Sequence, residues 1–160
     1  MSASAPFLPM TTAPDGTIVH HVGITVSDID ASARFYGRLL GGDLFGPYRR
    51  CGPRIDAVTG HRGVVVEQMF VTATNGRTMV ELLSYTGGPE TVIEPDNSHV
   101  GAVHIAVTVD DIDAALNRLR SQGVSALSDP IEASPPLTGC RVVYVLDPDR
   151  VRVELVELPR

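Results

Sequence analysis

The sequence predicts an α+β fold built from two tandem modules, each with the order strand, helix, strand, strand, strand. The first observation behind this prediction is a repeated phrase. "HVGITVSDIDA" (21–31) returns as "HIAVTVDDIDA" (104–114), and seven of the eleven aligned residues are identical. The second observation is that "MVELL" (79–83) in the first half matches "RVELV" (152–156) in the second. A chain that repeats its first and last strand signals in the same order is expected to contain two copies of one unit.

The first half begins with a strand and a helix. Residues 19–26 contain the β-branched run "VGITV", which is typical of a strand. Ser27 or Asp28 can cap a helix over about 28–40, because both side chains accept hydrogen bonds from free backbone N–H groups. The paired glycines at 41–42 end this helix. Three further extended segments follow, at 43–49, 64–73 and 77–85.

The second half repeats this order. "VHIAVTV" (103–109) is the expected strand, Asp110 is the expected helix cap, and Gly123 ends the helix. Extended segments follow at 124–132, 140–146 and 151–158. Asn75-Gly76 predicts a hairpin turn in the first half, and "DPDR" (147–150) predicts the corresponding turn in the second.

The length of 160 residues fits one domain made of two halves that share a core. We expect that domain to cover 17–160. The segment 1–16 is rich in Ser, Ala, Thr and Pro, which predicts a flexible N-terminal tail. Within the domain we expect two modules and a linker, at about 17–86, 100–160 and 87–99 respectively.

Composition excludes several classes of function. The net charge is −6 and no Lys/Arg run is present, which argues against a nucleic-acid partner. No apolar run is long enough to span a membrane, and the N-terminus lacks the basic and apolar regions of a signal peptide. Cys51 and Cys140 are isolated in the sequence, which is typical of reduced thiols. We therefore expect a cytoplasmic protein.

One segment is locally basic. "YRRCGPR" (48–54) contains three arginines in seven residues. Arginine forms bidentate pairs with carboxylate or phosphate, so this segment could hold an anionic group of a substrate. The alternative interpretation is a solvated loop.

A histidine opens each copy of the repeated phrase. Side chains alternate between the two faces of a strand, so His21 and His104 point away from the Val/Ile face that packs on the helix. Glu81 and Glu154 occupy equivalent positions in the matching apolar strands. A carboxylate in an apolar strand is costly unless it is paired or bound to a metal.

Two interpretations of these four residues remain open. They form either a solvated polar face or a set of metal ligands. Apolar positions differ between the copies, as Ile24 and Val107 do, whereas the histidines and glutamates are retained. Two nitrogen and two oxygen donors suit one divalent metal such as zinc, nickel, cobalt, manganese or iron. The sequence therefore predicts a metal site formed by His21, Glu81, His104 and Glu154.

The motifs "HVGITVSDIDASARFY", "MVELLSY", "VHIAVTVDDIDAAL" and "LDPDRVRVELVEL" resemble those of the vicinal oxygen chelate superfamily. This superfamily includes glyoxalase I, methylmalonyl-CoA epimerase, extradiol dioxygenases and bleomycin resistance proteins. The resemblance covers about 18–158 and implies two βαβββ modules in a cupped mixed sheet around one metal, with His21, Glu81, His104 and Glu154 as its ligands. The chain departs from the family pattern at Arg150, where a glycine is usual in the turn.

The resemblance implies a divalent-metal-dependent isomerase, epimerase or lyase. Such an enzyme works through a metal-stabilised enolate or enediolate next to a carbonyl, as methylmalonyl-CoA epimerase and glyoxalase I do. A metal-free antibiotic-binding protein and an Fe(II) extradiol-type dioxygenase are the alternatives. The partners implied are a small-molecule carbonyl or acyl-thioester substrate and a second copy of the chain in a homodimer.

Two glutamates are candidates for proton transfer. Glu154 is one, because a carboxylate near the metal can act as general base and then as acid. Glu67 is the other, because epimerases of this family are similar in carrying a catalytic glutamate on this strand. Only one of Glu67 and Gln68 can face the site, since neighbours on a strand point to opposite faces.

The remaining histidines are weaker candidates. His20 points to the face opposite His21 and is not expected to be a ligand. His61 and His99 lie in expected loops, where they either touch substrate or stay exposed to solvent. The loop 49–63 is longer than a simple hairpin needs, and loops of this length often cover sites and set substrate choice.

Overall fold

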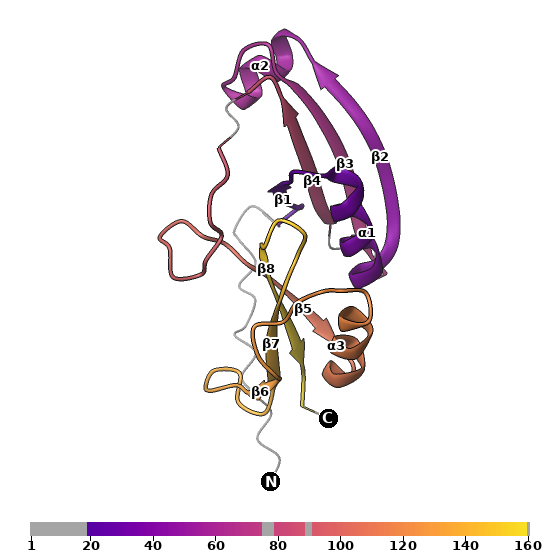
Figure 1. Cartoon of the computed structure of the whole chain (residues 1–160), viewed down its shortest axis with the longest axis vertical. Coiled ribbons are helices and arrows are strands. Elements are labelled where there is room, and N and C mark those ends of the chain that lie inside the picture. The colour runs from indigo at the N-terminus through magenta and orange to yellow at the C-terminus, as the bar shows by residue number, and fades with distance from the viewer. Residues whose placement is uncertain (1–18, 75–78, 89–90, 160) are drawn as a thin grey trace, which may run out of the picture. The chain divides into compact units, whose positions relative to one another are not determined.

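The computed structural model describes residues 19–74, 79–88 and 91–159. They form two compact units, Ile18–Ile93 and Glu94–Arg160. Each unit contains one four-stranded mixed sheet with a helix against it (Figure 1). The N-terminal tail 1–16 and the predicted Asn75-Gly76 hairpin turn lie outside the described residues.

The first unit contains β1 (Val22–Thr25), α1 (Ile29–Leu40), β2 (Gly41–Cys51), α2 (Pro53–Thr59), β3 (Val65–Ala73) and β4 (Met79–Thr86). Its strands lie in the order β1-β4-β3-β2. The first and last strands, β1 and β4, pair in parallel, and the other pairs are antiparallel.

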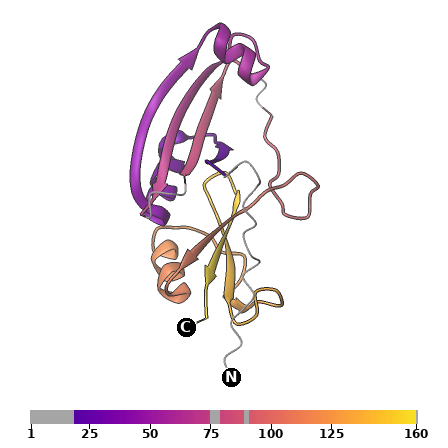
Figure 2. The same ribbon diagram turned by 180° about the vertical axis from the view of Figure 1, so that it is seen from behind.

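The second unit contains β5 (Ile105–Val109), α3 (Ile112–Arg120), β6 (Ile131–Glu132), β7 (Arg141–Leu146) and β8 (Arg152–Glu157). Its order, β5-β8-β7-β6, repeats that of the first unit, and β5 and β8 are again the parallel pair. The reverse view in Figure 2 shows the strands of each sheet from behind. The predicted α+β class and the repeated strand–helix–strand–strand–strand order are confirmed.

Each sheet packs one face on its helix. In the first unit α1 contacts β3 and β4, and the buried residues of these strands alternate with more exposed ones. In the second unit Leu116 and Leu119 of α3 are buried, as are Val153 and Leu155 of β8. The alternation follows the pleat of the strand, so the other face of each sheet is available for polar side chains.

Both main helices begin at an aspartate of the repeated phrase. Asp28 accepts a hydrogen bond from Ala31 N at 2.9 Å, which confirms the predicted cap. The predicted cap Asp110 is wrong, because Asp111 caps α3 and accepts from Ala114 N at 2.9 Å. Asp111 is the extended residue directly before the first helical turn, where a carboxylate reaches a free N–H group. It also aligns with Asp28 in the repeat.

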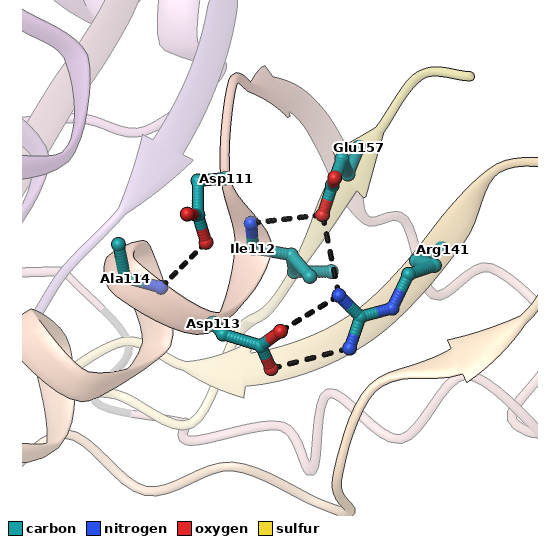
Figure 3. Close-up of polar contacts among 6 residues, drawn as sticks. All are labelled: Asp111, Ile112, Asp113, Ala114, Arg141 and Glu157. Atoms are coloured by element: carbon teal, nitrogen blue, oxygen red, sulfur yellow. Dashed lines mark hydrogen bonds and ion pairs between the residues drawn. The ribbon is translucent and has the colours of Figure 1, made fainter. Parts of the chain in front are cut away.

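The first turn of α3 is tied to the second sheet by two further groups (Figure 3). Glu157 of β8 accepts a hydrogen bond from Ile112 N at 3.1 Å. Arg141 of β7 donates to both carboxylate oxygens of Asp113, at 2.7 and 3.2 Å. This guanidinium holds the pKa of Asp113 below its ordinary value. The start of the helix is therefore fixed on β7 and β8 by charge-assisted hydrogen bonds.

Two segments differ from the sequence-based expectation. The expected loop 49–63 contains the end of β2 and the helix α2. This helix begins at Pro53, ends at a left-handed Gly60 and buries none of its residues, so it leaves no amphipathic pattern to detect. The expected extended segment 124–132 forms only the short strand β6 and a bridge between Ala126 and Val145.

Arg150 adopts the backbone conformation expected of the glycine that usually occupies this position of the turn in the superfamily it resembles. Its φ is 68°, in the left-handed region that glycine adopts most readily. The buried Asp147 stabilises the turn by accepting hydrogen bonds from Asp149 N at 2.9 Å and Val151 N at 2.7 Å. Arginine in this turn therefore does not displace β8.

Among the described residues, no helix is both long and apolar enough to cross a membrane.

We predict that Asp111→Ala lowers the free energy of unfolding by about 1 kcal/mol, because Ala114 N loses its hydrogen-bond acceptor. Urea unfolding followed by circular dichroism measures this change. Asp110→Ala is the matched control, since it removes the neighbouring carboxylate and leaves the cap intact. Equal losses in the two variants would contradict the assignment of the cap to Asp111.

Candidate metal centre

The first histidine–carboxylate pair lies at the parallel junction of β1 and β4. Gly23 stands opposite Glu81 in the strand register, and His21 lies two residues before Gly23 on the same face. The distance from His21 Nε2 to Glu81 Oε2 is 3.0 Å. The Glu81 side chain is 13% exposed and that of His21 is 37% exposed. Parallel pairing of the first and last strands thus brings together two residues 60 positions apart in the chain.

The second pair repeats this arrangement at the junction of β5 and β8. Ala106 stands opposite Glu154, and His104 lies two residues before Ala106. The distance from His104 Nε2 to Glu154 Oε2 is 3.4 Å. The exposed fractions, 40% for the histidine and 14% for the glutamate, closely match those of the first pair. The repeat in the sequence is therefore a repeat of one local geometry.

Small residues leave room beside each carboxylate. A Cβ atom added at Gly23 would lie 3.5 Å from Glu81 Oε2. The equivalent residue beside Glu154 is Ala106. A larger side chain at either position would occupy the space next to the carboxylate oxygen.

The donor atoms of each pair fit a shared divalent ion. Two ligand atoms that each lie about 2.1 Å from one metal, at tetrahedral or octahedral angles, are roughly 3.0–3.4 Å apart. The measured separations are 3.0 and 3.4 Å. Imidazole nitrogen and carboxylate oxygen are also the ligand types that zinc, nickel, cobalt and iron accept.

Within 19–74, 79–88 and 91–159, no three His, Cys, Asp or Glu residues lie together as a metal cluster. The four-ligand set therefore stays a prediction.

Gln68 of β3 holds the carboxylate of the first pair. Its amide nitrogen donates to Glu81 Oε1, while Glu81 Oε2 faces His21. The two oxygens of Glu81 thus have separate partners, which fixes the orientation of the carboxylate. Gln68 is part-buried and lies two residues before Phe70, the cross-strand neighbour of Glu81, so both side chains are on the face of Glu81. Sequence reasoning named Gln68 only as the alternative to Glu67.

Glu67 is not brought to the His21–Glu81 pair. It is exposed and lies on the opposite face of β3 from Gln68. Its cross-strand neighbours are Arg49 of β2 and Ser84 of β4. Of the two catalytic candidates, only Glu154 belongs to a histidine–carboxylate pair.

An aromatic residue stands beside each histidine, and sequence reasoning missed both. Phe70 contacts His21 edge to face, with ring centroids 6.0 Å apart. Tyr144 contacts His104 in the same way at 5.4 Å. Phe70 is opposite Glu81 and Tyr144 is opposite Glu154 in the strand register. Extending the comparison to "QMFV" (68–71) and "VVYV" (142–145) could have found this third matched position.

The hydroxyl of Tyr144 makes the second pair different from the first. It lies 3.4 Å from His104 Nε2. Burial raises the pKa of Tyr144, and the negative charge of Glu154 raises it further. Both effects disfavour the phenolate, so the hydroxyl remains a hydrogen-bond donor beside the carboxylate. Phe70 supplies no such donor in the first unit.

Of the remaining histidines, His20 contacts a predicted ligand. His20 Nδ1 lies 2.8 Å from His21 Nδ1, so both ring nitrogens of His21 have a partner. An imidazole that binds a metal through one nitrogen is usually held by a second contact through the other. His61 is exposed, and the ring of His99 contacts the backbone of Glu94 at 3.1 Å. Neither has a described contact with the two pairs.

Comparison with known proteins identifies the family of the chain. The profile of the Glyoxalase/Bleomycin resistance protein/Dioxygenase superfamily matches residues 18–155. The chain belongs to this superfamily. It is 32% identical over 156 residues to 2-epi-5-epi-valiolone epimerase of Actinomyces sp., an alignment that covers 91% of this chain and 82% of the relative. It is also 32% identical over 139 residues to the uncharacterised protein YaeR of Escherichia coli K12, covering 87% and 95%.

Solved structures of this superfamily share the fold. A glyoxalase family protein of Bacillus cereus superposes with a TM-score of 0.75 at 23% identity, over 89% of this chain and 94% of the other. The trypanothione-dependent glyoxalase I of Leishmania major superposes with a TM-score of 0.56 at 22% identity, over 88% and 86%. These likenesses confirm the fold predicted for this chain.

We predict that Tyr144→Phe removes a phenol that ionises above its ordinary pKa of 10.0. Ultraviolet absorbance of phenolate, measured against pH for both proteins, gives the difference curve, and circular dichroism verifies that the fold persists. The difference should return to an ordinary tyrosine titration when both proteins are unfolded in urea. A folded-state difference curve with a midpoint at or below the ordinary value would contradict the prediction.

Proposed function

We propose that this protein is a divalent-metal-dependent epimerase or isomerase that moves a proton on a carbon next to a carbonyl group. The observation that carries the proposal is the matched geometry of His21–Glu81 and His104–Glu154. An epimerase relative at 32% identity supports the reaction type. This reaction type falls within the group of isomerases, epimerases and lyases that the sequence predicts.

His21, Glu81, His104 and Glu154 would hold the metal. When bound, a divalent metal acts as a Lewis acid that polarises the substrate carbonyl and stabilises the developing negative charge. Gln68 keeps one oxygen of Glu81 turned toward His21, and His20 fixes the ring of His21. These contacts orient His21 and Glu81 before a metal or a substrate binds.

Glu154 is the proposed proton carrier. Its carboxylate is largely shielded from solvent at 14% exposure, and it lies beside the protonated hydroxyl of Tyr144. A carboxylate in this position can remove a proton from carbon, which leaves a planar enolate, and can return a proton to the same face. The configuration inverts when a second proton donor reprotonates the enolate on its opposite face. Tyr144 would hold a polar oxygen of the substrate by donating a hydrogen bond.

The substrate proposed is a small ketone. The relative from Actinomyces is named for an epi-valiolone, and the ending of that name denotes a ketone. The sequence also predicts an acyl thioester as a possible substrate, and a thiol-conjugated aldehyde is the third candidate. All three carry an acidic C–H next to a carbonyl, so one assay of proton exchange covers them.

We predict that the protein takes up about one zinc, cobalt or nickel ion per chain, and that Glu81→Gln or His104→Ala lowers the metal affinity at least about tenfold. Isothermal titration calorimetry on chelator-treated protein measures this. Glu67→Gln is the matched control, because it makes the same chemical change on the opposite face of β3. Wild-type protein that binds no divalent metal would contradict the proposal and favour a metal-free binding protein.

We predict that the metal-loaded protein exchanges solvent deuterium into 2-epi-5-epi-valiolone at the carbon next to the carbonyl. Proton magnetic resonance measures the exchange. Glu154→Gln should slow it by about 100-fold or more, because the general base is lost. If Glu67→Gln slows the exchange instead, Glu67 and not Glu154 carries the proton. Absence of exchange with this ketone, with methylmalonyl-CoA and with a hemithioacetal would contradict the proposed reaction.

A further inference from the structure

We propose that Arg50 binds an anionic group, a phosphate or a carboxylate, on the substrate of this protein. The inference rests on the proposed function, because it places the anionic group on the same molecule as the reacting carbonyl. It is carried by the register of β2, by a hydrogen-bond connection to Glu81, and by the charge around Arg50.

The register of β2 places Arg50 on the face of the first sheet that carries Glu81, Phe70 and Gln68, here called the site face. Tyr48 is opposite Gln68, and Arg50 is opposite Val66. Residues opposite one another in an antiparallel pair share a face, and so do residues two apart on one strand. Tyr48, Arg50, Gln68 and Phe70 therefore point to the same side of the sheet as Glu81.

A β-bulge is what puts Arg50 on this face. Phe45 is opposite Phe70, but Tyr48 is opposite Gln68, so the pairing shifts by one residue between them. Without the shift, Tyr48 would pair with Glu67 and both Tyr48 and Arg50 would turn to the helix side. Gly46 lies in the bulge with φ 121°, and a Cβ atom there would be 2.7 Å from Gln68 O. Bulges often redirect side chains next to functional sites.

Two hydrogen bonds connect Arg50 to the predicted metal ligand. Arg50 Nε donates to Gln68 Oε1 at 3.5 Å, and the amide nitrogen of Gln68 donates to Glu81 Oε1. This path spans one amide and one carboxylate, so the guanidinium lies within roughly 10 Å of the oxygen that faces His21. An anion in contact with Arg50 would then lie roughly 6–14 Å from that oxygen, since a guanidinium–anion contact takes up about 4 Å in any direction. A substrate that carries its anionic group a few bonds from the carbonyl, such as a sugar phosphate or a keto acid, can span such a distance.

Among the described residues, no carboxylate forms an ion pair with Arg50. The ion pairs of Arg120, Arg141, Arg150 and Arg152 all lie in the second unit. Arg50 instead lies over the ring of Tyr48, with 5.2 Å from its guanidinium carbon to the ring centroid. The stack orients an exposed guanidinium, and none of the described contacts uses its two terminal nitrogens, which can therefore donate to an anion. A planar fork of this kind binds phosphate or carboxylate bidentately.

Binding of three metal-chelating hydroxamates tests the inference. Glycolohydroxamate is neutral, phosphoglycolohydroxamate adds a phosphate, and succinic monohydroxamate adds a carboxylate. Isothermal titration calorimetry on the zinc-loaded protein gives the dissociation constants. We expect one of the anionic compounds to bind about ten- to hundredfold more tightly than the neutral one, because a charge-assisted hydrogen bond contributes about that factor. The compound that binds more tightly, with its phosphate or its carboxylate, identifies the anionic group that Arg50 binds.

Arg50→Gln should abolish this preference and leave the affinity for glycolohydroxamate within about twofold. Arg49→Gln is the matched control, since Arg49 is the neighbouring arginine on the opposite face, beside Glu67. It should keep the preference. Equal wild-type affinities for the neutral and anionic compounds would overturn the inference, and so would a preference that survives in Arg50→Gln or is lost equally in Arg49→Gln.

The neutral hydroxamate separates this inference from the proposed function. If glycolohydroxamate binds only when zinc is present but the anionic compounds gain nothing, the metal site stands and the role of Arg50 is wrong. If the protein takes up no zinc, the proposed function fails and the inference fails with it. Arg50→Lys adds a further check, because a lysine should restore part of the affinity for phosphate without the bidentate contact.

Discussion

The parallel pairing of the first and last strands of each unit is the constraint on which the candidate site depends. It sets Gly23 beside Glu81 and Ala106 beside Glu154, so a histidine two residues upstream meets a carboxylate from the far end of the module. Parallel neighbours require a long crossover, and here α1 or α3 and two antiparallel strands supply it. The helix takes the apolar face of the sheet. The opposite face can then carry polar groups that would be costly in a core.

The two units use this shared geometry differently. Both have a histidine, a carboxylate and an aromatic ring at matched positions. The first unit adds the amide of Gln68, which holds Glu81, and the guanidinium of Arg50, which places a positive charge beside that amide. The second adds the phenol of Tyr144, whose raised pKa keeps its proton beside Glu154. The two units thus share one frame and differ in the groups around it, which are Gln68 and Arg50 in the first unit and Tyr144 in the second.

Most of the fold could be predicted from the sequence, because strand parity and helix capping are local. The repeated phrase located both parallel strands, and the alternation of valine and isoleucine showed which way His21 and His104 point. The contacts that depend on distant register could not be predicted in this way. Parity alone leaves Glu67 and Gln68 equivalent, and only the pairing with β4 shows that Gln68 meets Glu81. The helix α2 escaped prediction because it buries no side chain and so has no apolar periodicity. The predicted homodimer stays a prediction.

The bulge in β2 has a consequence for how such proteins can diversify. A single inserted or deleted residue in an edge strand reverses the direction of every side chain beyond it, up to the next turn. In this chain that reversal decides whether Tyr48 and Arg50 or their neighbours point to the site face, while His21 and Glu81 on other strands are undisturbed. One change in length therefore exchanges a whole set of side chains on that face at once. Substrate range can shift by a step in register, without any stepwise replacement of binding residues.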